Sequence, residues 1–248
     1  MTESVVPTTS SSSVLLLRVI TGIFCAILGV SLILALAIVF LPSNTFLAVS
    51  NYLQIITAIA GALVFVYLYY RNERRDYLLY AAGAFALWGV SNIVWYVNII
   101  LGRRNEVFPG LIDIGMIAAI FLLSIAYQHA FPQKQVSGKI LLSVLAVAII
   151  VPVAIILTNG ITLQTAITFL YFFACGSLII TGLIRSLREY PLILAGTLLF
   201  AIAFMIYPIR ETFFLANPYL NLIGVMVCAG FSLIVLGLIS VNQKTSTA

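Results

Sequence analysis

Polar and charged residues along this chain are confined to short stretches, which long apolar runs separate. A helix needs about 20 mostly apolar residues to cross a bilayer. Four of the runs without Asp, Glu, Lys or Arg hold one such helix each, whereas 19–70 and 140–184 are too long for one. Both long runs contain a turn composition, at Pro42 to Asn44 and at Asn159-Gly160. The pattern therefore places two helices in each long run.

The pattern predicts an all-α integral membrane protein with eight transmembrane helices. The runs are apolar on all sides and do not alternate polar with apolar residues, as membrane strands of about 10 residues would. The predicted helices are 14–40, 46–70, 77–101, 110–131, 139–158, 163–184, 190–213 and 218–241.

The two halves of the chain repeat short patterns in the same order. The stretches 75–83 and 188–196 share Arg, an acid, Tyr, Leu, Ala and Gly at matching positions. Further on, Pro109 and Gly115 correspond to Pro218 and Gly224. We therefore predict two tandem four-helix units, related by an axis along the membrane normal. The predicted segments are a flexible polar tail (1–13), the first unit (14–131), a cytoplasmic linker (132–138), the second unit (139–241) and a C-terminal tail (242–248).

Charge changes this picture in two ways. Only 8% of the residues are charged, against about 25% in a soluble domain, which excludes a soluble enzyme or a nucleic-acid-binding domain. Nine of the 12 Lys and Arg residues fall on the side of the two termini, and Arg103, Arg104 and Arg210 fall on the other. The positive-inside rule then predicts the cell membrane with both termini in the cytoplasm. Membrane lipids and protein partners in the membrane are the expected contacts.

The chain lacks the parts of most intramembrane active sites. Its single histidine, His129, cannot form a bis-imidazole haem site or a histidine-rich metal site. Its three lysines lie in predicted loops or the tail, and its three cysteines lie in separate helices. We therefore expect no catalytic residues, no metal and no cofactor.

Polar side chains gather toward the extracytoplasmic ends of the predicted helices. On the helix 77–101, Trp88, Asn92, Trp95 and Asn98 recur every three or four residues and so share one face. Charged residues lie at the same level on two other helices, and further polar residues accompany them. These are Asp113, Arg210 and Glu211, with Asn51, Gln54, Tyr207 and Asn221.

The predicted ligand-binding residues are Trp88, Asn92, Trp95, Asn98, Asp113, Arg210 and Glu211. In the functional interpretation, Arg210 neutralises Asp113 or a ligand anion, asparagines orient the ligand and tryptophans wall it. In the alternative, the charged residues pair or reach water at the membrane boundary. The tryptophans are then interface anchors and the asparagines join helices.

The stretch from Trp88 to Trp95, followed by a polar loop and Pro109 to Asp113, resembles multi-pass membrane sensor domains of prokaryotic signalling proteins. Those domains show a helix that ends in a polar-aromatic stretch, then a helix that starts with Pro-x-x-x-Asp. They normally precede a histidine-kinase or diguanylate-cyclase module. Because the sequence stops at Ala248, the resemblance implies a sensor-like module without an output domain.

The length and the eight helices are also similar to those of the lysoplasmalogenase family. That family has paired intramembrane aspartates, each after Gly or Ser. The comparable position here is Ser91-Asn92, and the second half has no acid in Ala203-Phe204-Met205. This resemblance implies a shared fold without the water-activating carboxylates.

The sequence thus favours a non-catalytic sensor-like binding module or an accessory subunit of a membrane complex. The alternative is a small transporter built from parallel repeats. An intramembrane lipid enzyme is least favoured, because His129 is expected about 25–30 Å from Asp113 and Glu211 across the bilayer.

Overall fold

The computed structural model describes residues 11–38, 40–71, 75–102, 109–185, 189–213 and 221–245. Within these ranges the fold is all-α, as predicted, and no helix end lies more than four residues from its predicted position. The helices are α1 (Ser11–Ala37), α2 (Ser43–Arg71), α3 (Asp76–Ile100), α4 (Leu111–Ala130), α5 (Gly138–Asn159), α6 (Leu163–Ile184), α7 (Pro191–Phe213) and α8 (Leu222–Thr245).

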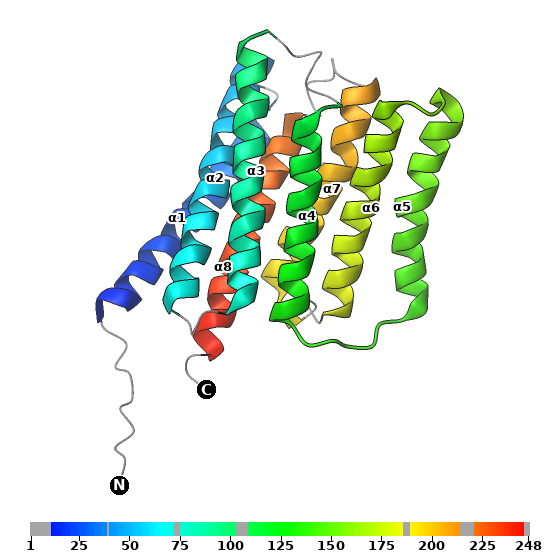
Figure 1. Ribbon diagram of the computed structural model, residues 1–248. Coiled ribbons are helices and arrows are strands. Elements are labelled where there is room, and N and C mark those ends of the chain that lie inside the picture. The colour runs from blue at the N-terminus through cyan, green and yellow to red at the C-terminus, as the bar shows by residue number, and fades with distance from the viewer. Residues whose placement is uncertain are drawn as a thin grey trace.

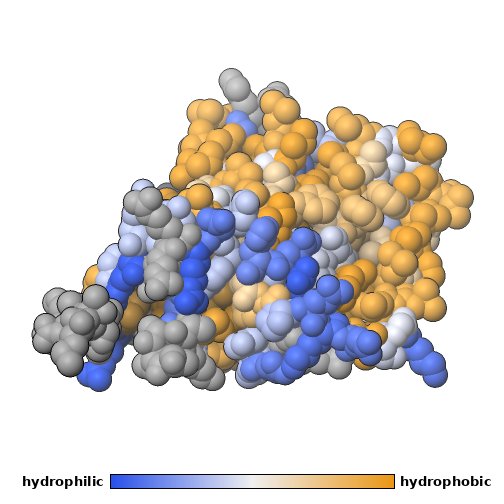
Figure 2. Space-filling model, turned by 60° about the horizontal axis from the view of Figure 1, so that its bottom comes forward, coloured by the Kyte–Doolittle hydropathy of each residue, from blue (hydrophilic) through white to orange (hydrophobic). Residues whose placement is uncertain are grey.

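All eight helices are long and apolar enough to cross a membrane. They run alternately up and down, so α1 begins and α8 ends at the same end of the bundle (Figure 1). We call this the terminal end and the opposite one the distal end. Figure 2 turns the terminal end toward the viewer and shows hydrophilic residues there and apolar residues on the flanks. The chain therefore has the helices of a multi-pass membrane protein.

The helices extend into both predicted tails. Residues 11–13 already belong to α1, and 242–245 continue α8. The remaining tail residues, together with Arg74, Arg103, Arg104 and Arg188, lie outside the described ranges. Between α4 and α5, residues 132–137 are not helical, and α5 starts at Gly138, the last residue of the predicted linker.

The break in the apolar run 140–184 shows how a few residues end one helix and start the next. Gly160 follows α5 with a φ of +78°, in the left-handed region that glycine adopts without strain. Thr162 then caps α6, since its Oγ1 accepts a hydrogen bond of 3.2 Å from the Thr165 backbone N–H. The chain reverses within three residues and lays α5 against α6.

Six of the helices form a closed ring. Each helix in the order α2, α3, α4, α6, α7 and α8 packs against the next, and α8 packs back against α2. Helix α1 lies outside the ring against α8, with a smaller contact to α2. Helix α5 packs against α6 and lies at the edge of the bundle (Figure 1).

Aromatic side chains fill the centre of the ring, so it is not an open pore. The ring of Trp88 packs edge to face on two phenylalanines, with ring centroids 4.3 Å from Phe204 and 5.7 Å from Phe231. Helices α7 and α8 approach most closely at two glycines, because a Cβ on Gly196 would lie 2.6 Å from the Gly230 carbonyl oxygen. This packed centre supports a polar space at the distal end.

Candidate functional site

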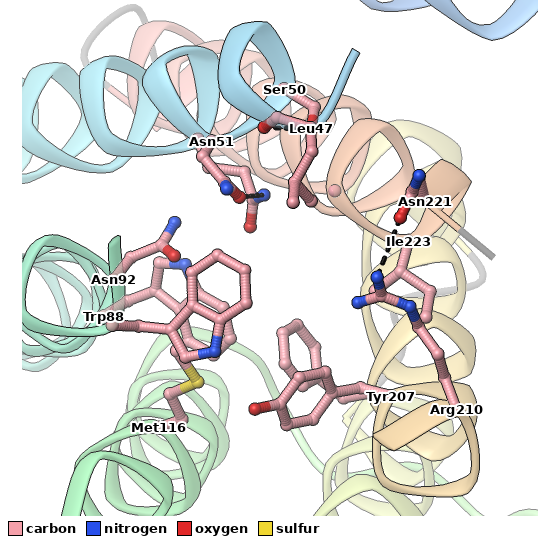
Figure 3. A pocket seen from close by; sticks show the side chains of 14 residues that line it. Leu47, Ser50, Asn51, Trp88, Asn92, Met116, Tyr207, Arg210, Asn221 and Ile223 are labelled. Atoms are coloured by element: carbon pink, nitrogen blue, oxygen red, sulfur yellow. Dashed lines mark hydrogen bonds between the residues drawn. The ribbon is translucent and has the colours of Figure 1, made fainter. Parts of the chain in front are cut away.

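A pocket lies at the distal end of the ring, beside the aromatic centre. The pocket is partly open to the surface, and the space between its walls, including solvent at its mouth, is about 430 Å³. Side chains from α2, α3, α4, α7 and the start of α8 surround it (Figure 3). The lining residues are Leu47, Ser50, Asn51, Gln54, Trp88, Asn92, Trp95, Met116, Phe204, Tyr207, Arg210, Asn221, Ile223 and Gly224.

Helix α3 supplies the wall that the sequence predicted. Trp88, Asn92 and Trp95 follow at spacings of four and three residues, which places them on one helical face. All three are buried, at 1%, 3% and 6% exposure respectively. The deepest, Trp88, also belongs to the aromatic centre, so α3 links the pocket to the core of the ring.

Helix α2 is the neighbour of α3 in the ring and carries Asn51 and Gln54. The Gln54 amide donates a 3.2 Å hydrogen bond to Asn51 Oδ1. Gly224 of α8 allows this arrangement, because a Cβ there would lie 2.7 Å from Gln54 Nε2. The absence of a side chain at Gly224 thus gives the α2 amides their room.

Several N–H donors in this pocket have no acceptor. In the described part of the chain, Asn51 Nδ2, Asn92 Nδ2 and Trp88 Nε1 are buried without a hydrogen-bond partner. A buried donor left unsatisfied costs about 1–3 kcal/mol. Native proteins keep few such groups, and each requires an explanation such as a water, an ion or a ligand.

Arg210 lies at the pocket wall with its charge already matched. Its Nη1 donates to Glu211 Oε1 at 2.8 Å, and its Nη2 donates to Asn221 Oδ1 at 2.8 Å. The side chains of the ion pair are 5% and 8% exposed. The expectation that Arg210 neutralises Asp113 is therefore replaced by an ion pair with the adjacent Glu211.

Asp113 instead holds α4 and α6 together. Its Oδ2 accepts a 2.8 Å hydrogen bond from the Gly110 backbone N–H, which caps the start of α4. Its Oδ1 accepts a 2.8 Å hydrogen bond from the Tyr171 hydroxyl of α6. The carboxylate is fully buried in these contacts and does not line the pocket.

Of the predicted ligand-binding residues, the structure brings Trp88, Asn92, Trp95 and Arg210 together around one space. Asn98, Asp113 and Glu211 lie outside the lining. Sequence reasoning missed the lining residues that carry no polar signal, such as Phe204, Met116 and Gly224. It also missed Ser50, although its neighbour Asn51 marks that turn of α2 as polar.

The cysteines and the histidine do not gather into a second site within the described residues. Cys25, Cys175 and Cys228 are free thiols, and His129 packs against the Tyr80 ring at 5.2 Å toward the terminal end. Among the described residues, no three His, Cys, Asp or Glu side chains lie close enough to hold a metal ion.

No family model, curated protein or solved structure matches this chain. The resemblances to membrane sensor domains and to lysoplasmalogenases therefore stay predictions. The function has to be inferred from the pocket itself.

Proposed function

We propose that this chain is a non-catalytic, sensor-like binding module in a membrane, acting alone or as an accessory subunit of a membrane complex. The observation that carries the proposal is the distal pocket with its unmatched buried donors. A ligand that accepts hydrogen bonds from Asn51, Asn92 and Trp88 would remove the cost of burying them. Binding thus explains a feature that packing alone leaves costly.

The composition of the pocket wall supports binding over catalysis. The described lining residues include no carboxylate, histidine, cysteine or lysine. Arg210 is the charged residue of this wall, and Glu211 already matches its charge. The lining hydroxyls of Ser50 and Tyr207 would need an adjacent general base to act in catalysis, and the described lining residues supply none.

We also propose the finer topology of two tandem units, with cytoplasmic termini and a pocket that faces outward. The contacts around the ring support the repeat, since α2–α3, α3–α4 and α4–α6 correspond to α6–α7, α7–α8 and α8–α2. Helices α1 and α5 depart from it, because α1 packs on α8 whereas α5 packs on α6. A fluorescent reporter fused after Ala248 should be fluorescent in cells, and an active periplasmic phosphatase at that position would contradict the orientation.

Native mass spectrometry of the protein in nanodiscs tests the binding role. We expect one small molecule to stay bound at up to one equivalent, with lower occupancy in Asn92→Leu and unchanged occupancy in the matched control Asn98→Leu. A stoichiometric protein partner without a small molecule would assign the accessory-subunit role instead. A bare chain in every preparation would overturn the proposal.

A small transporter is the second candidate, favoured by the repeated contacts around the ring. A pocket open at one end and blocked by aromatics toward the other has the form of one state of an alternating-access cycle. Proteoliposomes tested with a broad substrate panel would show saturable uptake if this is correct. Absence of flux for a compound that binds the pocket would exclude transport of that compound.

A further inference from the structure

We propose that the distal pocket takes an uncharged, membrane-soluble compound with carbonyl or ether oxygens on a flat ring, the chemistry of a quinone headgroup. This inference rests on the proposed binding function and specifies its ligand. Three properties of the pocket lead to it: the sign of its hydrogen-bonding groups, its charge and the nature of its walls.

The unmatched groups of the pocket are donors, so the ligand has to supply acceptors. Asn51 and Asn92 each offer an N–H₂ group to the space from two neighbouring helices, α2 and α3 (Figure 3). An amide can exchange its donor and acceptor by rotating, but an indole can only donate. The buried N–H of Trp88 therefore fixes the requirement for an acceptor oxygen.

Among the described residues that line the pocket, none carries an unmatched charge that would attract an anion. The guanidinium of Arg210 is held by Glu211 at 2.8 Å, and both side chains are buried. A carboxylate or phosphate would have to displace Glu211 and leave that carboxylate buried without its partner. Asp113, also buried, lies on the neighbouring α4 and adds a further negative group. An uncharged acceptor avoids both costs.

The walls are aromatic and flat. Trp88, Trp95, Phe204 and Tyr207 present rings to the space, and Met116 adds a flexible thioether. Aromatic rings prefer edge-to-face or offset stacking with another flat ring, and a thioether also packs well against one. A planar conjugated ring with oxygens at its edge therefore fits these walls and can reach the donors.

The chain contains its own fluorescent reporter for this test. It has two tryptophans, and both line the pocket, so intrinsic tryptophan fluorescence reports on this site. The ligand tested is a short-chain benzoquinone, which is titrated into the whole protein in nanodiscs. We expect saturable quenching that follows a one-site curve. The corresponding hydroquinone should bind more weakly, because its phenolic oxygens are weaker acceptors than carbonyl oxygens and it adds O–H donors to a site that already has unmatched donors.

Variants separate binding at the pocket from collisional quenching in the lipid. Loss of one neutral hydrogen bond should weaken binding roughly 2- to 12-fold. We expect this for Asn92→Leu, and for Trp88→Phe with Trp95 as the reporter, whereas Asn98→Leu should bind as the unmodified chain does. Linear quenching that is equal in all four proteins would overturn the proposal.

Charged competitors decide between this inference and the broader binding role. An alkyl phosphate and an alkyl carboxylate of matched chain length should leave the quinone titration unchanged. If either anion binds saturably at the tryptophans and the quinone does not, the uncharged ligand is wrong while the binding module stands. If no probe binds and native mass spectrometry finds a bare chain, the binding module is wrong as well.

Discussion

The two ends of the bundle differ in how completely their buried polar side chains are paired. Toward the terminal end they pair between helices: the Tyr77 hydroxyl donates to Asn242 Oδ1 at 3.0 Å, and the hydroxyls of Tyr127 and Thr197 lie 2.7 Å apart. At the distal end, Asn51, Asn92 and Trp88 have N–H groups without acceptors in the described residues. The same kind of apolar helix carries both sets.

This difference separates polar groups that join the helices of the bundle from polar groups that have no partner within it. Hydrogen bonds between membrane helices stabilise the packed state modestly, and the terminal end makes them. The distal end pairs Asp113 with Tyr171 and Arg210 with Asn221. It leaves the three donors of Asn51, Asn92 and Trp88 unpaired among the described residues, and is therefore less stable than the same helices could be. Such a cost is typical of sites whose missing partner is a ligand.

The largest effect should come from breaking the buried ion pair at the distal end. Arg210→Met removes the guanidinium that pairs with the buried Glu211 carboxylate at 2.8 Å, and loss of one partner of a buried pair costs about 3–5 kcal/mol of the free energy of unfolding. Denaturation in detergent micelles measures this loss. The double variant Arg210→Met with Glu211→Met should recover most of it, and equal stability of single and double variants would contradict the pairing.

A smaller loss is expected from breaking a pair toward the terminal end. Tyr127→Phe removes the hydrogen bond to Thr197 between α4 and α7. In membrane helices such a bond contributes on average about 0.6 and at most about 1.7 kcal/mol. Tyr70→Phe, at a 73% exposed position, is the matched control and should leave the denaturation midpoint unchanged.

Removal of an unpaired polar side chain at the distal end should not lower the free energy of unfolding. Asn92→Leu removes an unsatisfied buried amide, so the ligand-free chain should be as stable as before or gain up to about 1 kcal/mol. Ligand should then raise the melting temperature of the unmodified chain by more than it raises that of the variant. A clear loss of stability in the ligand-free variant would show that Asn92 serves packing.

The smallest effect belongs to Asn98→Leu, the same substitution six residues further along α3. Asn98 is half-buried and does not line the pocket. We expect the free energy of unfolding to change by less than about 0.5 kcal/mol and ligand binding to stay constant. Loss of binding in this variant would extend the site beyond its present lining.

The helices could be located from the sequence because charged residues and turn residues are costly within a span. Their arrangement could not, because side chains that face lipid and side chains that face protein are equally apolar. Helix α5 is the most apolar of the eight, yet only Ala148 and Pro152 are buried in it. Helix α8 is almost as apolar and is the most buried. Hydropathy therefore did not reveal which helices form the ring.

The α3 side of the pocket was predictable because one helix sets the spacing of Trp88, Asn92 and Trp95. The ionic contacts were not, because they depend on neighbours that spacing does not reveal. Arg210 pairs with the adjacent residue, and Asp113 caps its own helix and binds Tyr171, 58 positions away. The repeat also gives no guide here: Gly115 packs on Ser91 of α3, whereas the corresponding Gly224 packs on α2.

The contact between α8 and α2 has a consequence for how the protein is made. About 150 residues separate the end of α2 from the start of α8, which is roughly 10–30 s of synthesis at typical translation rates. Throughout that interval a nascent α2 lacks the helix that covers the face of Ser50 and Gln54. A chain released before α8 emerges cannot close the ring, so assembly has to finish after translation of the last helix.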